Sequence, residues 1–158
     1  MRTNQKEASR KKSLGELGEL FALKTLVDNE YDKIRNLNDI NMNSEFADIY
    51  CEKNGERYVI SVKARNKYQK NGKLNSQYNL GEKAYEKASR ISKKYKAEPL
   101  WMAIQFEDNC YSVYMGSLQS LNGANAIPVN KCEKGEIGKI LVYKKRHYFD
   151  FSYYTNKR

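Results

Sequence analysis

The chain has 158 residues and a mass of 18.5 kDa, the size of one folded domain with a substantial core. Hydrophobic residues make up 40% of the sequence and charged residues of both signs 30%, which excludes a disordered polyelectrolyte. Twenty-nine lysines and arginines against 19 acidic residues give a net charge of +10, which favours an anionic partner, nucleic acid before a membrane surface.

The N-terminus lacks the apolar stretch of a secretory signal, and the sequence holds no apolar run of about 18 residues. We therefore expect a cytoplasmic protein that does not associate with membranes. Its three cysteines, Cys51, Cys110 and Cys132, are odd in number and far apart, which argues against a disulfide framework and against a zinc site.

Residues 1–12 are polar and basic, and we expect them to form a flexible arm, either a solvated tail or an arm that contacts DNA. A helix is predicted to start at Ser13, because Ser13 and Glu16 have the spacing of a capping box, and to run to about Asp28. Two glycines weaken this helix slightly and suggest close packing where they lie (Gly15 and Gly18).

Three strands are expected next, over residues 31–37, 46–52 and 57–64. Between the last two, Asn54-Gly55 is the strongest short-range signal for a two-residue hairpin turn. Counting outward from that turn places Asp48 opposite Ser61, with Cβ atoms about 5 Å apart, and Lys63 on the same face.

The remaining chain alternates polar loops with apolar segments. We expect a loop over 66–80, a helix from about 81 to 96, strands over 100–106 and 110–115, a loop over 117–136, and a second hairpin with strands over 140–143 and 148–154. The order of helix, three strands, helix and further strands predicts a mixed α/β or α+β fold.

Asp48 and Lys63 lie within otherwise apolar strands, where charges are costly unless they are paired or useful. Two interpretations are open. The pair is either a plain ion pair at a sheet edge or part of a site for a hard cation such as Mg²⁺, which binds carboxylates, waters and phosphate oxygens.

Segment 46–65, FADIYCEKNGERYVISVKAR, resembles the core of PD-(D/E)xK nucleases, in which one strand carries an Asp and the next a (D/E)-x-K motif. Segment 15–22, GELGELFA, is similar to the first-helix signature of small members, and the layout after residue 81 is similar to archaeal-type Holliday-junction resolvases. The resemblance covers about residues 13–115. It implies a restriction-endonuclease-like fold with a central mixed sheet flanked by helices, in one domain over 13–158 that ends in a Tyr-rich β extension over 138–155.

The resemblance also implies roles for individual residues. Asp48 would bind Mg²⁺, for which Mn²⁺ would substitute, and Lys63 would be the catalytic lysine that holds the attacking water or the phosphate. Glu19 matches the first-helix carboxylate that approaches the metal; its alternative is a solvent-facing helix carboxylate.

Ser61 departs from the family pattern, because it stands at the catalytic position where Asp or Glu is usual, and a neutral hydroxyl is a poor Mg²⁺ ligand. Either a carboxylate from the following helix replaces it, Glu82 first and Glu86 as the alternative, or the site is degenerate and binds DNA without cutting it.

Several polar and basic residues that follow the lysine motif suit phosphate, sugar and base contacts, although an ordinary polar loop is equally open. They are Arg65, Lys67, Lys70, Lys73 and Gln77. The basic residues of the helix at 81–96 are expected to form a solvated face rather than a track for phosphates, and His147 a surface residue rather than a base.

We therefore expect a metal-dependent DNA endonuclease that hydrolyses phosphodiester bonds, with a leaning to branched DNA, as in a resolvase. A restriction or homing endonuclease on the same fold, and a catalytically degenerate DNA-binding domain, are the alternatives. Cutting both strands suggests a homodimer, and no small-molecule cofactor is expected.

Overall fold

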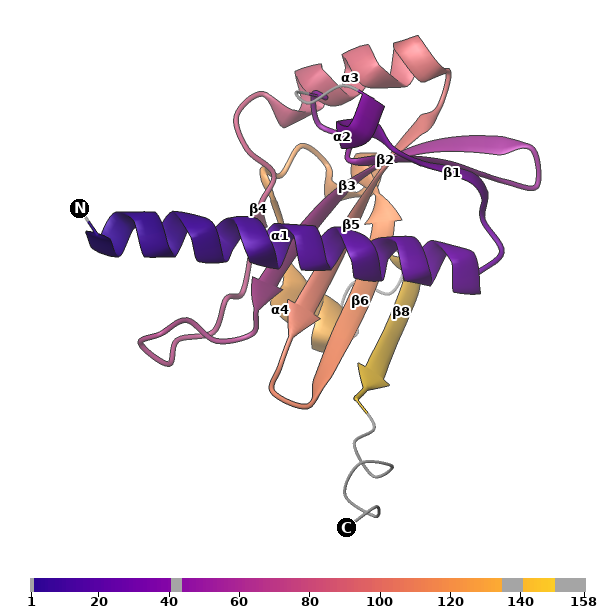
Figure 1. The fold of residues 1–158 in the computed structure, drawn as a ribbon. Helices are drawn as coiled ribbons and strands as arrows, with labels where there is room; N and C mark the ends of the chain where they lie inside the picture. Colours follow the sequence, from indigo (N-terminus) through magenta and orange to yellow (C-terminus); the bar gives the residue numbers. More distant parts are fainter. Residues whose placement is uncertain (1, 41–43, 135–140, 150–158) are drawn as a thin grey trace.

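The computed structural model describes residues 2–40, 44–134 and 141–149. Its centre is a six-stranded mixed sheet with the order β1-β2-β3-β5-β6-β8, in which β3 and β5 are parallel and the other neighbours antiparallel (Figure 1). The strands are β1 (Asp32–Asn36), β2 (Ile49–Lys53), β3 (Glu56–Asn66), β5 (Glu98–Phe106), β6 (Cys110–Ser117) and β8 (Leu141–Tyr148). The expected fold class, a central mixed sheet flanked by helices, is confirmed.

Helices cover both faces of this sheet (Figure 1). The long α1 (Arg2–Asp28) crosses one face, where Ala22 and Leu26 pack on the alternate apolar residues of β2, β3, β5 and β6. The other face is covered by α3 (Ala84–Tyr95), a 3-10 helix η1 (Leu118–Leu121), α4 (Val129–Lys134) and the small sheet of β4 (Tyr78–Asn79) and β7 (Ala126–Ile127). A short α2 (Leu37–Ile40) follows β1.

A close contact fixes where α1 crosses the sheet. A Cβ added at Gly18 would overlap the Cβ of Ala64 in β3, well inside the 3.0 Å below which such contacts essentially never occur. At Gly15, one turn earlier, an added Cβ would meet nothing within 4 Å. The close packing expected at the glycines is therefore present at Gly18 and absent at Gly15.

The β2–β3 hairpin has the predicted register. Lys53 pairs with Glu56 across the Asn54-Gly55 turn, and the ladder continues to Ile49 opposite Ile60. Both turn residues have positive φ, 53° at Asn54 and 80° at Gly55, as a type I′ turn requires.

The start of α1 was predicted wrongly. Helix α1 begins at Arg2, so Ser13 and Glu16 lie inside it, and the capping box expected there does not form. Residues 2–12, expected to be an arm, are the first turns of this helix. Nothing in their polar sequence breaks a helix, because the segment holds no Gly or Pro.

The C-terminal hairpin was also predicted wrongly. A single strand, β8, runs through the expected turn and pairs with β6 from Cys110 opposite Tyr148 to Gly116 opposite Leu141. Pairing with a buried strand satisfies the backbone of the basic segment, and its exposed Lys144, Lys145 and Arg146 suit a sheet edge. Residues 150–154 of the expected second strand lie outside the described residues.

The segment 117–136, expected to be a loop, contains η1, β7 and α4. All three cysteines are buried and free. Among the described residues, no helix is long and apolar enough to cross a membrane.

Candidate active site

Asp48 lies immediately before β2, and hydrogen bonds fix both its backbone and its side chain. Its N–H donates to the Ile60 carbonyl (2.8 Å), and its own carbonyl accepts from the N–H of Leu37 (2.8 Å). Its carboxylate Oδ2 accepts from the N–H of Val62 (2.8 Å). Asp48 thus joins the hairpin to α2, and its second carboxylate oxygen, Oδ1, faces the first turn of α2.

Asn38, in that first turn, links Asp48 to α1. Its side-chain Nδ2 donates to Asp48 Oδ1 (3.2 Å) and to Glu19 Oε1 (3.1 Å). Asn36 holds this turn in place, since its side-chain oxygen accepts from the N–H of Asn38 (2.9 Å). Because Gly18 lets α1 approach β3, the next residue, Glu19, reaches the carboxylate of Asp48 through one shared amide.

The two carboxylates lack full compensation by positive charge. Burial raises the pKa of Asp48 above its ordinary value, against the lowering effects of the Val62 N–H, Asn38 and Lys63. Burial, and then repulsion from Asp48, raise the pKa of Glu19. Two adjacent carboxylates whose ionised forms are disfavoured make a site that a cation would stabilise.

Lys63 is partly buried beside this pair. Burial lowers the pKa of its ammonium group, attraction by Asp48 raises it, and repulsion from Arg65 and from Lys87 of α3 lowers it further. Asp48 and Lys63 are therefore close enough to interact, as the hairpin register predicted. Three cations beside two carboxylates make a region that can hold an anion next to a metal ion.

Ser61 is buried, with 1% of its surface exposed, and pairs with Trp101 of β5. Glu82, in the turn before α3, and Glu86, in its first helical turn, are both exposed. Within residues 2–40, 44–134 and 141–149, no group of three or more His, Cys, Asp or Glu side chains is placed to hold a metal. The structure therefore brings Glu19 and Asp48 together but does not add Glu82 or Glu86 to them.

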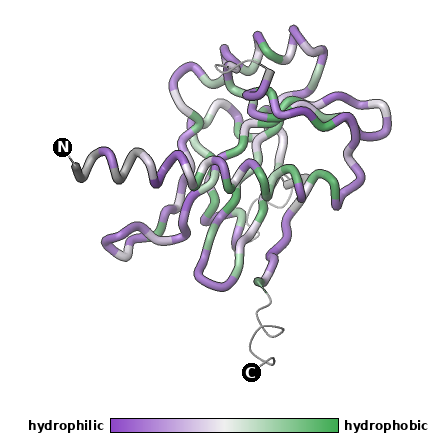
Figure 2. The backbone as a smooth tube through the Cα atoms, in the orientation of Figure 1, coloured by the Kyte–Doolittle hydropathy of each residue, from purple (hydrophilic) through white to green (hydrophobic). Residues whose placement is uncertain are grey.

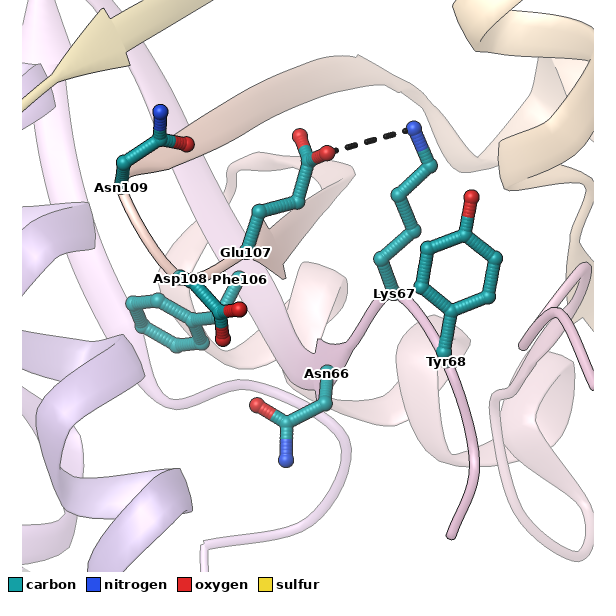
Figure 3. Close-up of a pocket in the computed structure, with 7 residues that line it drawn as sticks. All are labelled: Asn66, Lys67, Tyr68, Phe106, Glu107, Asp108 and Asn109. Atoms are coloured by element: carbon teal, nitrogen blue, oxygen red, sulfur yellow. Dashed lines mark hydrogen bonds and ion pairs between the residues drawn. The ribbon is translucent and has the colours of Figure 1, made fainter. Parts of the chain in front are cut away.

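Lys67 differs from the expectation that it contacts DNA. Its ammonium pairs with Glu133 of α4 (2.9 Å) and with Glu107 (3.4 Å), and only 14% of its side chain is exposed. Figure 3 shows it in a pocket of about 430 Å³, pointing to Glu107 and lying beside the Tyr68 ring. These interactions raise the pKa of Lys67 and engage it within the protein rather than with a phosphate.

The other expected DNA contacts are exposed. Arg65 and Lys70 line a cavity of about 440 Å³ between α1 and the segment after β3. Lys73 and Gln77 do not line it. On α3, Arg90 is paired with Glu45 through two contacts of 2.9 Å.

Sequence reasoning missed Asn38 and Lys87 as members of the site. Asn38 had a signal, since two asparagines after a strand are typical of a helix start, but its link to Glu19 depends on the position of α1. Lys87 had no signal beyond the basic face of its helix. His147 is partly buried and its ring stacks on Tyr111, with centroids 4.7 Å apart, so it lies away from Asp48 on the β8 edge.

No protein-family model matches the sequence, and no curated protein matches it. Among solved structures, the chain is similar to a Holliday junction resolvase of Archaeoglobus fulgidus, with 15% identity and a TM-score of 0.49, over 67% of this chain and 74% of that one.

Proposed function

We propose that this protein is a metal-dependent DNA endonuclease that hydrolyses phosphodiester bonds at Asp48, Glu19 and Lys63. The observation that carries the proposal is the pair of carboxylates joined by Asn38, with the partly buried ammonium group of Lys63 next to it. A net charge of +10 supports nucleic acid as the substrate.

The donor set fits Mg²⁺, which binds proteins through one or two carboxylates and completes its shell with waters and phosphate oxygens. Glu19 and Asp48 would hold the ion, because burial raises the pKa of both carboxyl groups and a bound cation would stabilise their ionised forms. Bound there, Mg²⁺ would supply activated water and neutralise charge on the phosphate. Mn²⁺, which takes the same oxygen ligands, would substitute for it.

The residues of the chain have separate tasks in this proposal. The N–H of Val62 and the amide of Asn38 orient the Asp48 carboxylate. Lys63 donates hydrogen bonds to the scissile phosphate or to the attacking water as negative charge builds up there. Arg65 and Lys87 add positive potential that draws the phosphate towards Lys63.

Cleavage of labelled DNA with Mg²⁺ or Mn²⁺ tests this proposal. Asp48→Asn and Lys63→Met are expected to reduce the rate at least about 100-fold, since the first removes a ligand of the metal ion and the second removes the ammonium group that acts on the phosphate. The matched controls are Asp108→Asn and Lys93→Met, which make the same changes at exposed positions outside the site. Equal cleavage by Asp48→Asn and the wild type would reject the proposal.

Ser61 supports a second candidate, a DNA-binding domain that no longer cleaves, because no group of three or more metal-ligating side chains is found among the described residues. This candidate predicts DNA binding without cleavage by either metal. Glu82→Gln and Glu86→Gln test whether a carboxylate of the α3 region takes part: unchanged cleavage in both would reject that role.

Side-by-side assays test which class of DNA is cleaved and whether the protein is a homodimer. Holliday-junction, flap and duplex DNA compared at equal concentration separate a resolvase-like enzyme from a restriction or homing enzyme. A resolvase-like enzyme is expected to cut the branched substrates faster. Light scattering with and without DNA tests the homodimer that paired cuts in two strands would require.

A further inference from the structure

A groove beside the site is formed by two segments that are far apart in the sequence. The N-terminal half of α1 projects past the sheet, and the chain between β3 and β4 lies next to it (Figure 1). Between them is a cavity of about 440 Å³, in the range of ligand-binding pockets. Its lining residues are Arg10, Lys11, Leu14, Arg65, Asn66, Tyr68, Gln69, Lys70 and Asn75.

The lining is strongly basic. It contains Arg10 and Lys11 from α1 and Arg65 and Lys70 from the opposite wall, and no acidic residue. Both walls are hydrophilic along this stretch, whereas the apolar residues gather in the second half of α1 and in the central strands (Figure 2). Cations on two facing walls suit a chain of phosphates that runs between them.

The groove also offers an apolar surface. Tyr68 is 56% exposed, and Leu14 lies on the opposite wall. Tyr68 lines this groove as well as the neighbouring pocket, in which Lys67 lies over its ring at 5.7 Å (Figure 3). An aromatic ring among cations is typical of proteins that bind unpaired strands, because bases stack on the ring while the cations hold the phosphates.

The groove and the candidate site share strand β3. Arg65 contributes to its lining and lies two residues beyond Lys63 on β3, so the two side chains are on the same face of this strand. A nucleic-acid strand in the groove would therefore continue towards Asp48 and Lys63. The two walls of the groove can hold one strand from both sides, whereas a duplex presents a pair of backbones across grooves about 6 and 12 Å wide.

We propose that the groove between α1 and the segment 66–75 binds one unpaired strand of DNA and delivers it to the site of Asp48 and Lys63. The inference rests on the proposed function and names its substrate: DNA with a single-stranded arm rather than uninterrupted duplex.

The test measures binding by fluorescence anisotropy, without divalent ions and in the Asp48→Asn background, so that no substrate is cut. Labelled oligothymidylate, a blunt duplex of equal length and a duplex with a single-stranded arm are compared. The expected result is tighter binding of the two substrates that contain an unpaired strand.

Matched variants assign this preference to the groove. Lys11→Glu and Lys70→Glu are expected to weaken binding of the unpaired strand and to reduce its salt slope by about 0.7 for each phosphate that is no longer neutralised. Lys12→Glu on α1 and Lys93→Glu on α3 make the same charge change at exposed positions that do not line the groove, and are expected to have smaller effects. Tyr68→Ala is expected to weaken strand binding at least about fivefold, and Tyr68→Phe to preserve it.

Equal effects of the groove variants and their controls, or equal weakening of duplex and unpaired-strand binding, would overturn the inference. Urea denaturation of each variant separates a binding defect from misfolding. If Tyr68→Ala does not fold, the comparison of Lys11→Glu with Lys12→Glu tests the inference in its place. Because binding is measured without metal, the two proposals fail separately. Cleavage without strand preference removes only this inference, and strand preference in a wild type that never cleaves removes only the nuclease.

Discussion

Replacement of Gly18 by alanine tests whether the approach of α1 to β3 builds the site. The added Cβ would overlap the Cβ of Ala64, which has no rotamer by which to move away, so the helix or the strand must shift. Alanine gains about 1 kcal/mol over glycine inside a helix, whereas overpacking costs about 1–3 kcal/mol. We expect Gly18→Ala to lower the free energy of unfolding by up to about 2 kcal/mol.

Gly15→Ala is the matched control, one turn away in the same helix, where the added Cβ meets nothing within 4 Å. It is expected to raise the free energy of unfolding by about 1 kcal/mol. Because helix propensity is common to both variants, their difference in urea denaturation reports the overpacking cost alone, about 1–3 kcal/mol.

Activity gives a second measurement from the same pair. A shift of α1 displaces Glu19, so Gly18→Ala is expected to cleave DNA more slowly than Gly15→Ala. Adding Ala64→Gly to Gly18→Ala removes the overlap and is expected to show a favourable coupling in a double-mutant cycle. Equal stabilisation by both glycine replacements would refute the reasoning.

Three further predictions concern charge. Mg²⁺ is expected to raise the melting temperature of the wild type but not that of Asp48→Asn. Without metal, Asp48→Asn is expected to be more stable than the wild type at pH 7, because burial raises the pKa of the Asp48 carboxyl and disfavours its ionised form. Lys67→Met should lower the free energy of unfolding by about 1–3 kcal/mol in urea denaturation and leave DNA affinity unchanged, whereas Lys73→Met should leave the free energy of unfolding nearly unchanged. A loss of DNA affinity without a loss of stability in Lys67→Met would contradict the pairing of Lys67 within the protein. Burial and nearby lysines lower the pKa of His147 from 6.5, so the unfolded chain binds a proton at a higher pH than the folded chain and stability is lost as the pH falls below about 6.5. Between pH 7.5 and pH 5.5, His147→Phe should therefore lose less stability than the wild type in denaturation experiments. An equal loss in both proteins would exclude this contribution.

The β2–β3 hairpin and the proximity of Asp48 to Lys63 could be predicted from the sequence because both depend on local signals. Asn54-Gly55 fixes the turn, the turn fixes the register, and the register brings Asp48 to the same part of the sheet as Lys63. The helix that ends near Asp28 and the buried face of α3 followed from apolar periodicity in the same way.

Contacts between distant segments could not be predicted. Lys67 pairs with Glu133, 66 residues away, and no local pattern distinguishes it from a solvated loop lysine. Asn38 likewise becomes part of the site through its contact with α1. The early start of α1 was missed because a cap at Ser13 is a local signal that a continuing helix overrides.

The unbroken course of α1 has a mechanical consequence. One rod of backbone hydrogen bonds carries Lys11 at the groove and Glu19 at the catalytic pair, which are about 12 Å apart along the axis at 1.5 Å per residue. A hinged linker would let the two ends drift relative to each other. A stiff helix instead keeps this spacing constant, so in the proposed nuclease it would determine which bond of a bound strand is cut.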